Sequence, residues 1–188
     1  MMATDDRPYI IKTYDRWIIL VIVLVAGWFL FRPIFAYAVY YRGLSFERMI
    51  QMHTAEHYYK KSIRIYPNIA DGWIGLGELY YMWAPAQHEY YQKGIDVFTQ
   101  GLSANPHNST LSFDLGRMYF RARDYRNAVG ALLRSAHDNP QSVFAWDYAA
   151  WASLRLGQRS NATRYWHQVL RVEPRNEAAR RALRRYGV

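Results

Sequence analysis

The sequence predicts an all-α protein in which a single membrane-spanning helix near the N-terminus leads into a solenoid of paired helices. Two observations predict this class. An uncharged, mostly apolar run of fifteen residues extends from Trp17 to Phe31, and beyond it small, bulky and proline residues recur at a step of 34 or 39 residues. Hydrophobic residues make up 51% of the 188 and charged residues 21%, which is apolar enough for one folded domain and an appendage.

The repeating part consists of units in which three kinds of residue keep their spacing. The columns are a small residue (Ala55, Gly94, Ala128, Ala162), a bulky residue (Tyr59, Phe98, Leu132, Trp166) and a proline (Pro67, Pro106, Pro140, Pro174). Because proline ends a helix, the spacing predicts that each unit consists of two helices joined by a turn, with the proline following the second helix. The five extra residues of the longer unit lie between positions 82 and 92, where an insertion lengthens a loop.

A further column of small residues lies in the first helix of each unit. Trp73, Leu76 and Tyr80 fall on one face of a helix, and Gly77 lets a neighbouring helix approach that face closely. The column comprises Gly43, Gly77, Gly116 and Ala150.

One 34-residue unit carries a full motif, made of Leu115-Gly116, Tyr119, Ala128, Leu132, Ser135 and Pro140. In these residues the sequence resembles the tetratricopeptide repeat family. The resemblance covers about three and a half to four units, near 36–69, 70–108, 109–142 and 143–174. It departs from the family pattern at the ends, with Arg42 in place of leucine, Ala149-Ala150 in place of Leu-Gly and Ser153 in place of tyrosine. The resemblance implies a right-handed helical solenoid that binds protein partners and needs no cofactor.

The sequence therefore divides into four parts. We expect a polar tail at 1–16, a transmembrane signal-anchor helix at 17–41 with a kink near Pro33, repeats at 36–174 and a capping helix at 175–188. The 25 residues of the second part can cross a hydrocarbon core of about 30 Å with room for tilt. A cleaved signal peptide is the alternative, because Ala36-Tyr37-Ala38 has the small-x-small form of a cleavage site. We expect the segment to be retained.

Arg32 interrupts the apolar segment and has two interpretations. It could be an intramembrane charge that pairs with a carboxylate or cofactor of another subunit, or it could snorkel to the lipid headgroups. The charges that flank the span also indicate an orientation. Three cations precede it (Arg7, Lys12 and Arg16) and two follow it (Arg42 and Arg48), which favours a cytoplasmic N-terminus and an extracytoplasmic repeat domain.

In the tetratricopeptide repeat family, partners usually lie along a concave wall made by the first helix of each pair. Carried over by register, this wall comprises Glu78, Tyr81, Phe113, Arg117, Phe120, Tyr148, Trp151 and Arg155. The alternative is that some of these aromatic residues only complete the packing between helices. A well-known variant of the family clamps the terminal carboxylate of a chaperone with lysines and asparagines. Because the wall has neither residue type, we do not expect a chaperone tail to bind.

The last helix resembles the solvating cap that repeat arrays need. Asn176 can cap its start, and its outer face carries Arg180, Arg181, Arg184 and Arg185. These arginines form either a solvated face or a surface for anionic lipid or an acidic protein. The formal net charge of the chain is +9, but nucleic acid is not an expected partner of a membrane-tethered domain.

His53, Glu56 and His57 fit the H-x-x-E-H form of inverted zinc peptidases. Ala55 and Tyr59 lie in the repeat columns and therefore mark the core face of this helix. His53 and His57 are each two residues from Ala55, so they point away from the core. We therefore expect no metal site and no enzyme, and the zinc peptidase is a remote alternative. The sequence predicts a membrane-tethered protein-interaction module, an accessory, scaffold or assembly subunit of a membrane complex. The alternative is a tethered receptor for soluble peptides.

Overall fold

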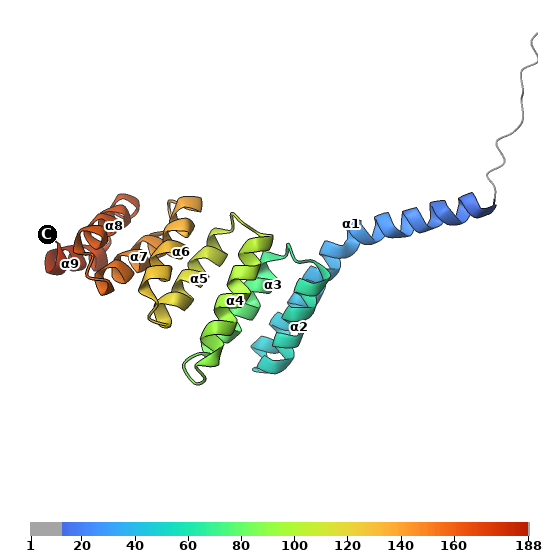
Figure 1. Cartoon of the computed structure of the whole chain (residues 1–188), viewed down its shortest axis with the longest axis horizontal. Coiled ribbons are helices and arrows are strands. Elements are labelled where there is room, and N and C mark those ends of the chain that lie inside the picture. The colour runs from blue at the N-terminus through green and yellow to red at the C-terminus, as the bar shows by residue number, and fades with distance from the viewer. Residues whose placement is uncertain (1–12, 188) are drawn as a thin grey trace, which may run out of the picture.

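The computed structural model describes residues 13–187, and within this range the chain is entirely helical apart from turns and short loops. The all-α class and the repeat solenoid are confirmed. Figure 1 shows a row of antiparallel helix pairs, with the first helix projecting from one end. The helices are α1 (Thr13–Arg48), α2 (Met52–Ile65), α3 (Ala70–Trp83), α4 (Glu89–Ala104), α5 (Ser109–Arg121), α6 (Tyr125–Asp138), α7 (Val143–Arg155), α8 (Arg159–Val172) and α9 (Glu177–Tyr186).

Helix α1 joins the expected membrane segment and the first helix of the first repeat in one element of 36 residues. It begins at Thr13, so positions 13–16, where we assigned no structure, are helical; the rest of the 1–16 tail lies outside the described residues. Its N-terminal part projects away from the solenoid with its apolar side chains exposed, whereas its C-terminal part packs against α2 (Figure 1). One helix therefore performs two structural roles.

Helix ends follow the repeat. The four column prolines each lie two residues beyond the end of an even-numbered helix, from Pro67 after α2 to Pro174 after α8. Side chains of Asn108, Asp124, Ser142 and Asn176 accept hydrogen bonds from the first turns of α5, α6, α7 and α9. The predicted cap at Asn176 is confirmed.

The small and bulky columns meet in the core. Tyr59, Phe98, Leu132 and Trp166 are completely buried, as are the small residues Ala55, Ala128, Ala150 and Ala162. A Cβ atom on Gly77 would lie 2.3 Å from the Phe98 ring, and one on Gly116 would lie 2.5 Å from Leu132. The missing side chains therefore make room for the bulky column, as the spacing predicted.

Gly116→Leu should lower the free energy of unfolding by about 1–3 kcal/mol, because the new side chain must displace Leu132 from a filled site. Gly130 is the control, since a Cβ there meets nothing within 4 Å. Chemical denaturation followed by circular dichroism measures both variants. Equal stability of Gly116→Leu and wild type would contradict the observed packing between α5 and α6.

The extra residues of the longer unit lengthen both the loop between α3 and α4 and its flanking helices: compared with α5 and α6, helix α3 has 14 residues against 13 and α4 has 16 against 14. The sequence had assigned them to the loop alone. An aromatic cluster fixes this loop, because the Tyr90 ring lies 5.0 Å from that of Trp83 and 5.4 Å from that of Tyr80. The insertion therefore leaves the register of the solenoid unchanged, as the sequence indicated.

Candidate partner-binding face on α3, α5 and α7

The eight residues that the register assigned to the wall lie on three neighbouring helices. Helix α5 contacts α3 on one side and α7 on the other. We call the surface formed by Glu78, Tyr81, Phe113, Arg117, Phe120, Tyr148, Trp151 and Arg155 the α3–α5–α7 face. Arg155 is exposed and the other seven are half-buried.

Arg117 holds the first two helices of this face together. Its Nη1 donates hydrogen bonds to Glu78 Oε1 and Asp114 Oδ1, each at 2.9 Å. The guanidinium also lies 4.4 Å from the centre of the Tyr81 ring and 5.6 Å from that of Phe113. The sequence assigned Arg117 to the wall but did not indicate that its charge is paired within the chain by Glu78 and Asp114.

Asp114 is the buried partner of this arginine. Its burial and the nearby Glu78 carboxylate raise the pKa of Asp114 to about 7, although Arg117 acts in the opposite direction. The carboxyl group therefore titrates near neutral pH in the folded chain. The register did not indicate it, because Asp114 lies between the core positions of α5.

The aromatic residues of the face contact one another across α5 and α7. The Tyr148 ring packs edge to face on Phe113, with centroids 5.7 Å apart, and on Phe120, at 5.5 Å. Phe144, one turn before Tyr148, has 70% of its surface exposed. Part of this aromatic surface thus completes packing, and part remains open to a partner.

A pocket of about 560 Å³ lies at one end of the face. Four predicted residues line it, namely Tyr81, Phe120, Tyr148 and Arg155, together with Arg121, Arg123 and Tyr125. The Arg121 guanidinium lies 4.4 Å from the centre of the Tyr81 ring. Within residues 13–187, Arg123 and Arg155 have no acidic partner. The pocket therefore combines aromatic walls with cationic groups available to a ligand.

The sequence interpretation missed three of the residues that line this pocket. Arg121 lies four residues after Arg117, so helical spacing could have predicted that it lies on the same face of α5. Arg123 and Tyr125 lie at the turn into α6, where the register of the first helices gives no information.

Trp151 belongs to the packing of the C-terminal cap. Its ring lies 5.3 Å from that of Trp166 and 6.0 Å from that of Tyr186. Arg181 and Arg185 lie beside it in a smaller cavity. This arrangement joins the predicted wall to the predicted basic cap.

The other two cap arginines are placed differently. Arg180 pairs with Glu177 at 3.1 Å and donates to the Pro174 carbonyl oxygen at 2.8 Å, so its role is local. Arg184 is exposed.

Arg32 contacts the solenoid. Its Nε–H donates to the carbonyl oxygen of Ile65 at the end of α2, and its guanidinium lies 5.8 Å from the Tyr66 ring centre. The Ile65 carbonyl oxygen therefore accepts one of the hydrogen bonds that the Arg32 guanidinium can donate. Neither interpretation of Arg32 from the sequence included this contact.

The three residues of the H-x-x-E-H motif have other contacts. Glu56 accepts hydrogen bonds from Lys60 Nζ at 2.6 Å and Tyr80 Oη at 2.8 Å. Burial disfavours its charge, but these two bonds lower the pKa of Glu56. The His53 ring packs against Trp83 and that of His57 against Tyr58. The part of the chain that the structure describes has no cluster of three metal-ligating side chains.

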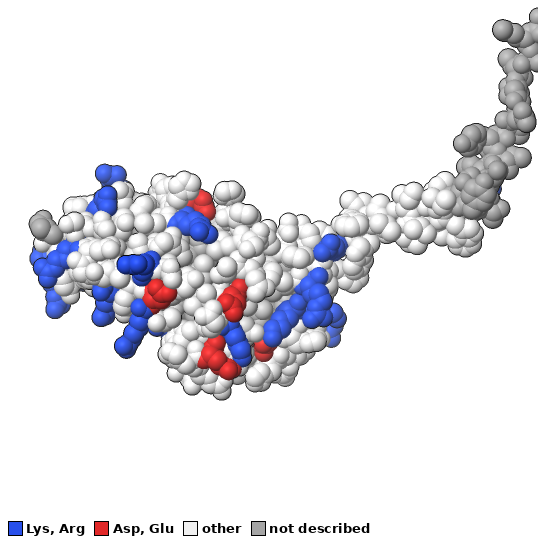
Figure 2. Space-filling view, in the orientation of Figure 1, with Lys and Arg blue, Asp and Glu red and all other residues white. Residues whose placement is uncertain are grey.

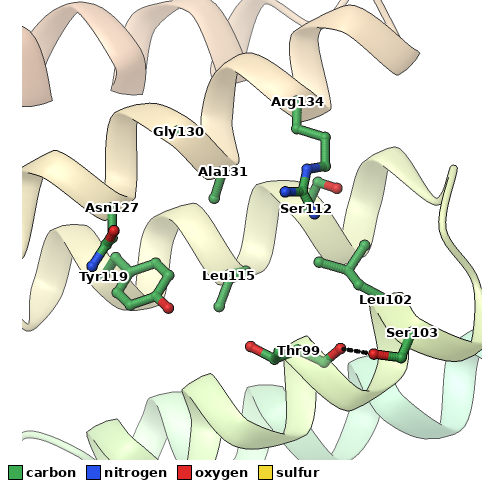
Figure 3. Close-up of a pocket in the computed structure, with 10 residues that line it drawn as sticks. All are labelled: Thr99, Leu102, Ser103, Ser112, Leu115, Tyr119, Asn127, Gly130, Ala131 and Arg134. Carbon is green, nitrogen blue, oxygen red and sulfur yellow. Dashed lines mark hydrogen bonds between the residues drawn. The ribbon is translucent and has the colours of Figure 1, made fainter.

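A second cavity, of about 370 Å³, lies between α4, α5 and α6 (Figure 3). In this view Arg134 of α6 points toward Ser112 of α5, and Leu102 lies between Arg134 and the two hydroxyl residues Thr99 and Ser103 of α4. None of the residues that the sequence singled out for function lines this cavity.

Comparison with known proteins gives the class of this fold. A model of the tetratricopeptide repeat family matches residues 86–143. Human RNA polymerase II-associated protein 3 is 27% identical over 95 residues, which are 50% of this chain and 14% of that protein. The chain thus spans a small part of the length of the curated relative it matches.

Solved structures extend the likeness over most of the solenoid. The crystal structure of MamA is 18% identical, with a TM-score of 0.65, and the match covers 73% of this chain and 77% of that one. The first TPR domain of Spaghetti (RPAP3), bound to the HSP90 peptide SRMEEVD, is 24% identical with a TM-score of 0.53, and the match covers 61% and 89%. At these identities the likeness shows the fold alone. The family model thus supports a tetratricopeptide repeat in residues 86–143, and the solved structures show the same helical fold over most of the chain. Tetratricopeptide repeat proteins are typically non-catalytic modules of protein–protein interaction.

Proposed function

We propose that this chain is a membrane-tethered interaction module that holds a protein partner on the α3–α5–α7 face, as an accessory, scaffold or assembly subunit of a membrane complex. The observation that carries the proposal is the pocket beside Tyr81 and Tyr148, in which Arg123 and Arg155 are free of acidic partners within residues 13–187. Aromatic and arginine side chains in such a setting contribute most of the energy of an interface. A partner segment with acidic and apolar side chains fits this chemistry.

Helix α1 supports the tether. It is long and apolar enough to cross a membrane, and none of its most apolar window is buried in the structure. Cleavage after Ala38 would cut a helix whose Ala36 is completely buried and whose Tyr40 packs against Tyr59. These contacts favour a retained anchor over a cleaved signal peptide. The full chain should stay in the membrane pellet after extraction at alkaline pH, and its release would refute the tether.

Orientation requires a separate test. Arg32 contacts α2 on the solenoid side. With Arg32 counted there, three cations flank each end of the span, and the difference of one that favoured an extracytoplasmic repeat domain disappears. The chain has no cysteine, so a single cysteine in place of Ser160 is a clean probe. Its reaction with a membrane-impermeant thiol reagent in intact cells would place the solenoid outside the cytoplasm.

Arg155→Ala and Arg123→Gly should each weaken partner retention by about tenfold or more, as expected for arginine anchors that become desolvated when a partner binds. Arg123 has φ of +65°, a conformation that glycine adopts without strain, so Arg123→Gly should change the free energy of unfolding by no more than about 1 kcal/mol. The measurement is quantitative recovery of co-purifying chains in mild detergent. Arg171→Gln, on the exposed surface of α8, is the matched control.

Normal partner recovery with both pocket variants would mean that the pocket is not the docking site.

A tethered receptor for soluble peptides is the second candidate. The structure of the Spaghetti domain with a peptide is the observation that favours it. The lysines and asparagines of a carboxylate clamp are absent from the α3–α5–α7 face, so the peptide of that complex is not the ligand we propose here. Recovery of free peptides in place of stable subunits would select this candidate.

A further inference from the structure

Helix α2 folds back along α1 until its last turn reaches the level at which the apolar run of α1 ends. Arg32 contacts the Ile65 carbonyl there, and further along the pair the rings of Tyr40 and Tyr59 lie 5.6 Å apart. These two contacts define an antiparallel register. Positions 32–40 of α1 lie beside positions 59–65 of α2.

The length of the apolar run brings this pair of helices close to a bilayer surface. Fifteen residues from Trp17 to Phe31 make about 22 Å of helix. A hydrocarbon core of about 30 Å needs roughly twenty residues, which places its boundary near Ala36. Ala36 lies within the interval that α2 covers. In a bilayer of ordinary thickness the boundary therefore falls within the paired interval: Ile65, level with Arg32, lies about 6 Å on the membrane side of it, and Tyr59, level with Tyr40, lies about 6 Å on the water side.

The side chains in this interval suit such a position. The part of α1 that does not pack on α2 exposes Ile34, Phe35, Tyr37 and Tyr41, an apolar and aromatic surface that continues from the span. Apolar and tyrosine side chains of this kind are typical of the membrane interface.

The exposed cations of α2 lie at the same level. Arg64 and Lys61 precede Ile65 by one and four residues, which is within about 6 Å along the helix axis. Neither has an acidic partner in the described part of the chain, whereas Lys60 is neutralised by Glu56 at 2.6 Å. In Figure 2 blue side chains form a row beside the base of the white projecting helix. The backbone of Lys61 then lies close to the boundary and that of Arg64 less than one turn on its membrane side, and the long side chains of both residues can extend to the phosphate groups of the headgroup layer.

We propose that the α1–α2 pair is a lipid-binding surface on which Lys61 and Arg64 bind the phosphate groups of anionic lipids. Ile34, Phe35, Tyr37 and Tyr41 lie in the interfacial layer beside them. Because the cations belong to the folded solenoid, lipid binding fixes the first repeat against the membrane surface. The span alone would hold the chain in the membrane but would not fix the solenoid. This inference rests on the membrane tether proposed above.

The test uses the full chain in lipid nanodiscs of phosphatidylcholine, with or without phosphatidylglycerol. A single cysteine in place of Asn68, an exposed residue just beyond α2, carries a nitroxide label, and one in place of Gln100 on α4 is the distant control. Accessibility of each label to a water-soluble relaxation agent is measured. The Asn68 label should be less accessible in the anionic discs, and the Gln100 label should not change.

Lys61→Gln with Arg64→Gln should abolish the difference at position 68, whereas Arg181→Gln with Arg184→Gln on α9 should preserve it. A chain that enters the discs but shows no dependence on lipid charge at position 68 would overturn the lipid-binding surface and leave the tether intact. An equal change at position 100 would also overturn it, since the whole solenoid would then approach the membrane. A chain that fails to enter either disc would refute the tether itself.

Discussion

Trp166→Ala should lower the free energy of unfolding of the solenoid by about 3–5 kcal/mol, the largest loss we expect from any single truncation. Trp166 is completely buried and contacts the rings of Trp151 and Tyr186. Its Nε1–H also donates to Asp147 Oδ1 at 3.1 Å. The truncation leaves a cavity and removes a donor from a half-buried carboxylate, and both effects destabilise the fold.

Urea denaturation followed by circular dichroism measures this loss. Phe144→Ala is the matched control, because Phe144 is an aromatic residue of the adjacent helix with 70% of its surface exposed. Its replacement should change the free energy of unfolding by no more than about 0.5 kcal/mol. Equal effects of the two variants would show that the bulky column is not the core of the last repeat.

Arg117→Ala should be the second largest loss, about 2–3 kcal/mol at pH 8. Breaking a fully buried ion pair costs about 3–5 kcal/mol, and the loss is smaller here because Arg117 and Glu78 reach solvent. The variant leaves Asp114 and Glu78 beside each other without their shared cation.

The loss from Arg117→Ala should be smaller at pH 5 than at pH 8. The pKa of Asp114 is raised to about 7, so at pH 5 this carboxyl is protonated and no longer attracts Arg117. In the wild type the same raised pKa means that the folded chain binds a proton below pH 7 which the unfolded chain binds only near pH 4. The contribution of Asp114 to stability therefore rises as the pH falls through 7.

Asp114→Asn isolates this contribution, since it should remove about 2 kcal/mol of the stability change between pH 7 and pH 5. Denaturation curves of the three proteins at pH 5 and pH 8 test both expectations. A loss from Arg117→Ala that did not depend on pH would mean that Asp114 stays ionised throughout.

The sequence predicted those features of the fold that depend on spacing alone. The fixed step placed Tyr59, Phe98, Leu132 and Trp166 in one column, and all four are buried. It also located the insertion near the turn between α3 and α4, although three of the five extra residues extend these two helices and only two lengthen the loop. Spacing is informative here because each repeat contacts mainly its neighbours, so one register describes the whole array.

Side-chain contacts between different helices could not be predicted from the spacing of residues. The register placed Arg117 beside Tyr81 and Phe113 on the α3–α5–α7 face but could not show that Glu78 and Asp114 neutralise it. It could not find Arg123, because the position of this residue depends on a turn with positive φ. The contact of Arg32 with Ile65 depends on how far α2 folds back along α1, which no local pattern encodes.

The continuity of α1 has a mechanical consequence. A helix that passes without a break from an apolar segment into the first repeat acts as a lever, so any tilt of the segment within a bilayer is transmitted to the solenoid. Transmembrane helices tilt by about 20° on average, and the tilt depends on bilayer thickness. If the chain is anchored as proposed, the height of the α3–α5–α7 face above the membrane would thus vary with the thickness of that membrane. Pro33, which lacks an N–H for the helical ladder, is the residue at which this lever can bend.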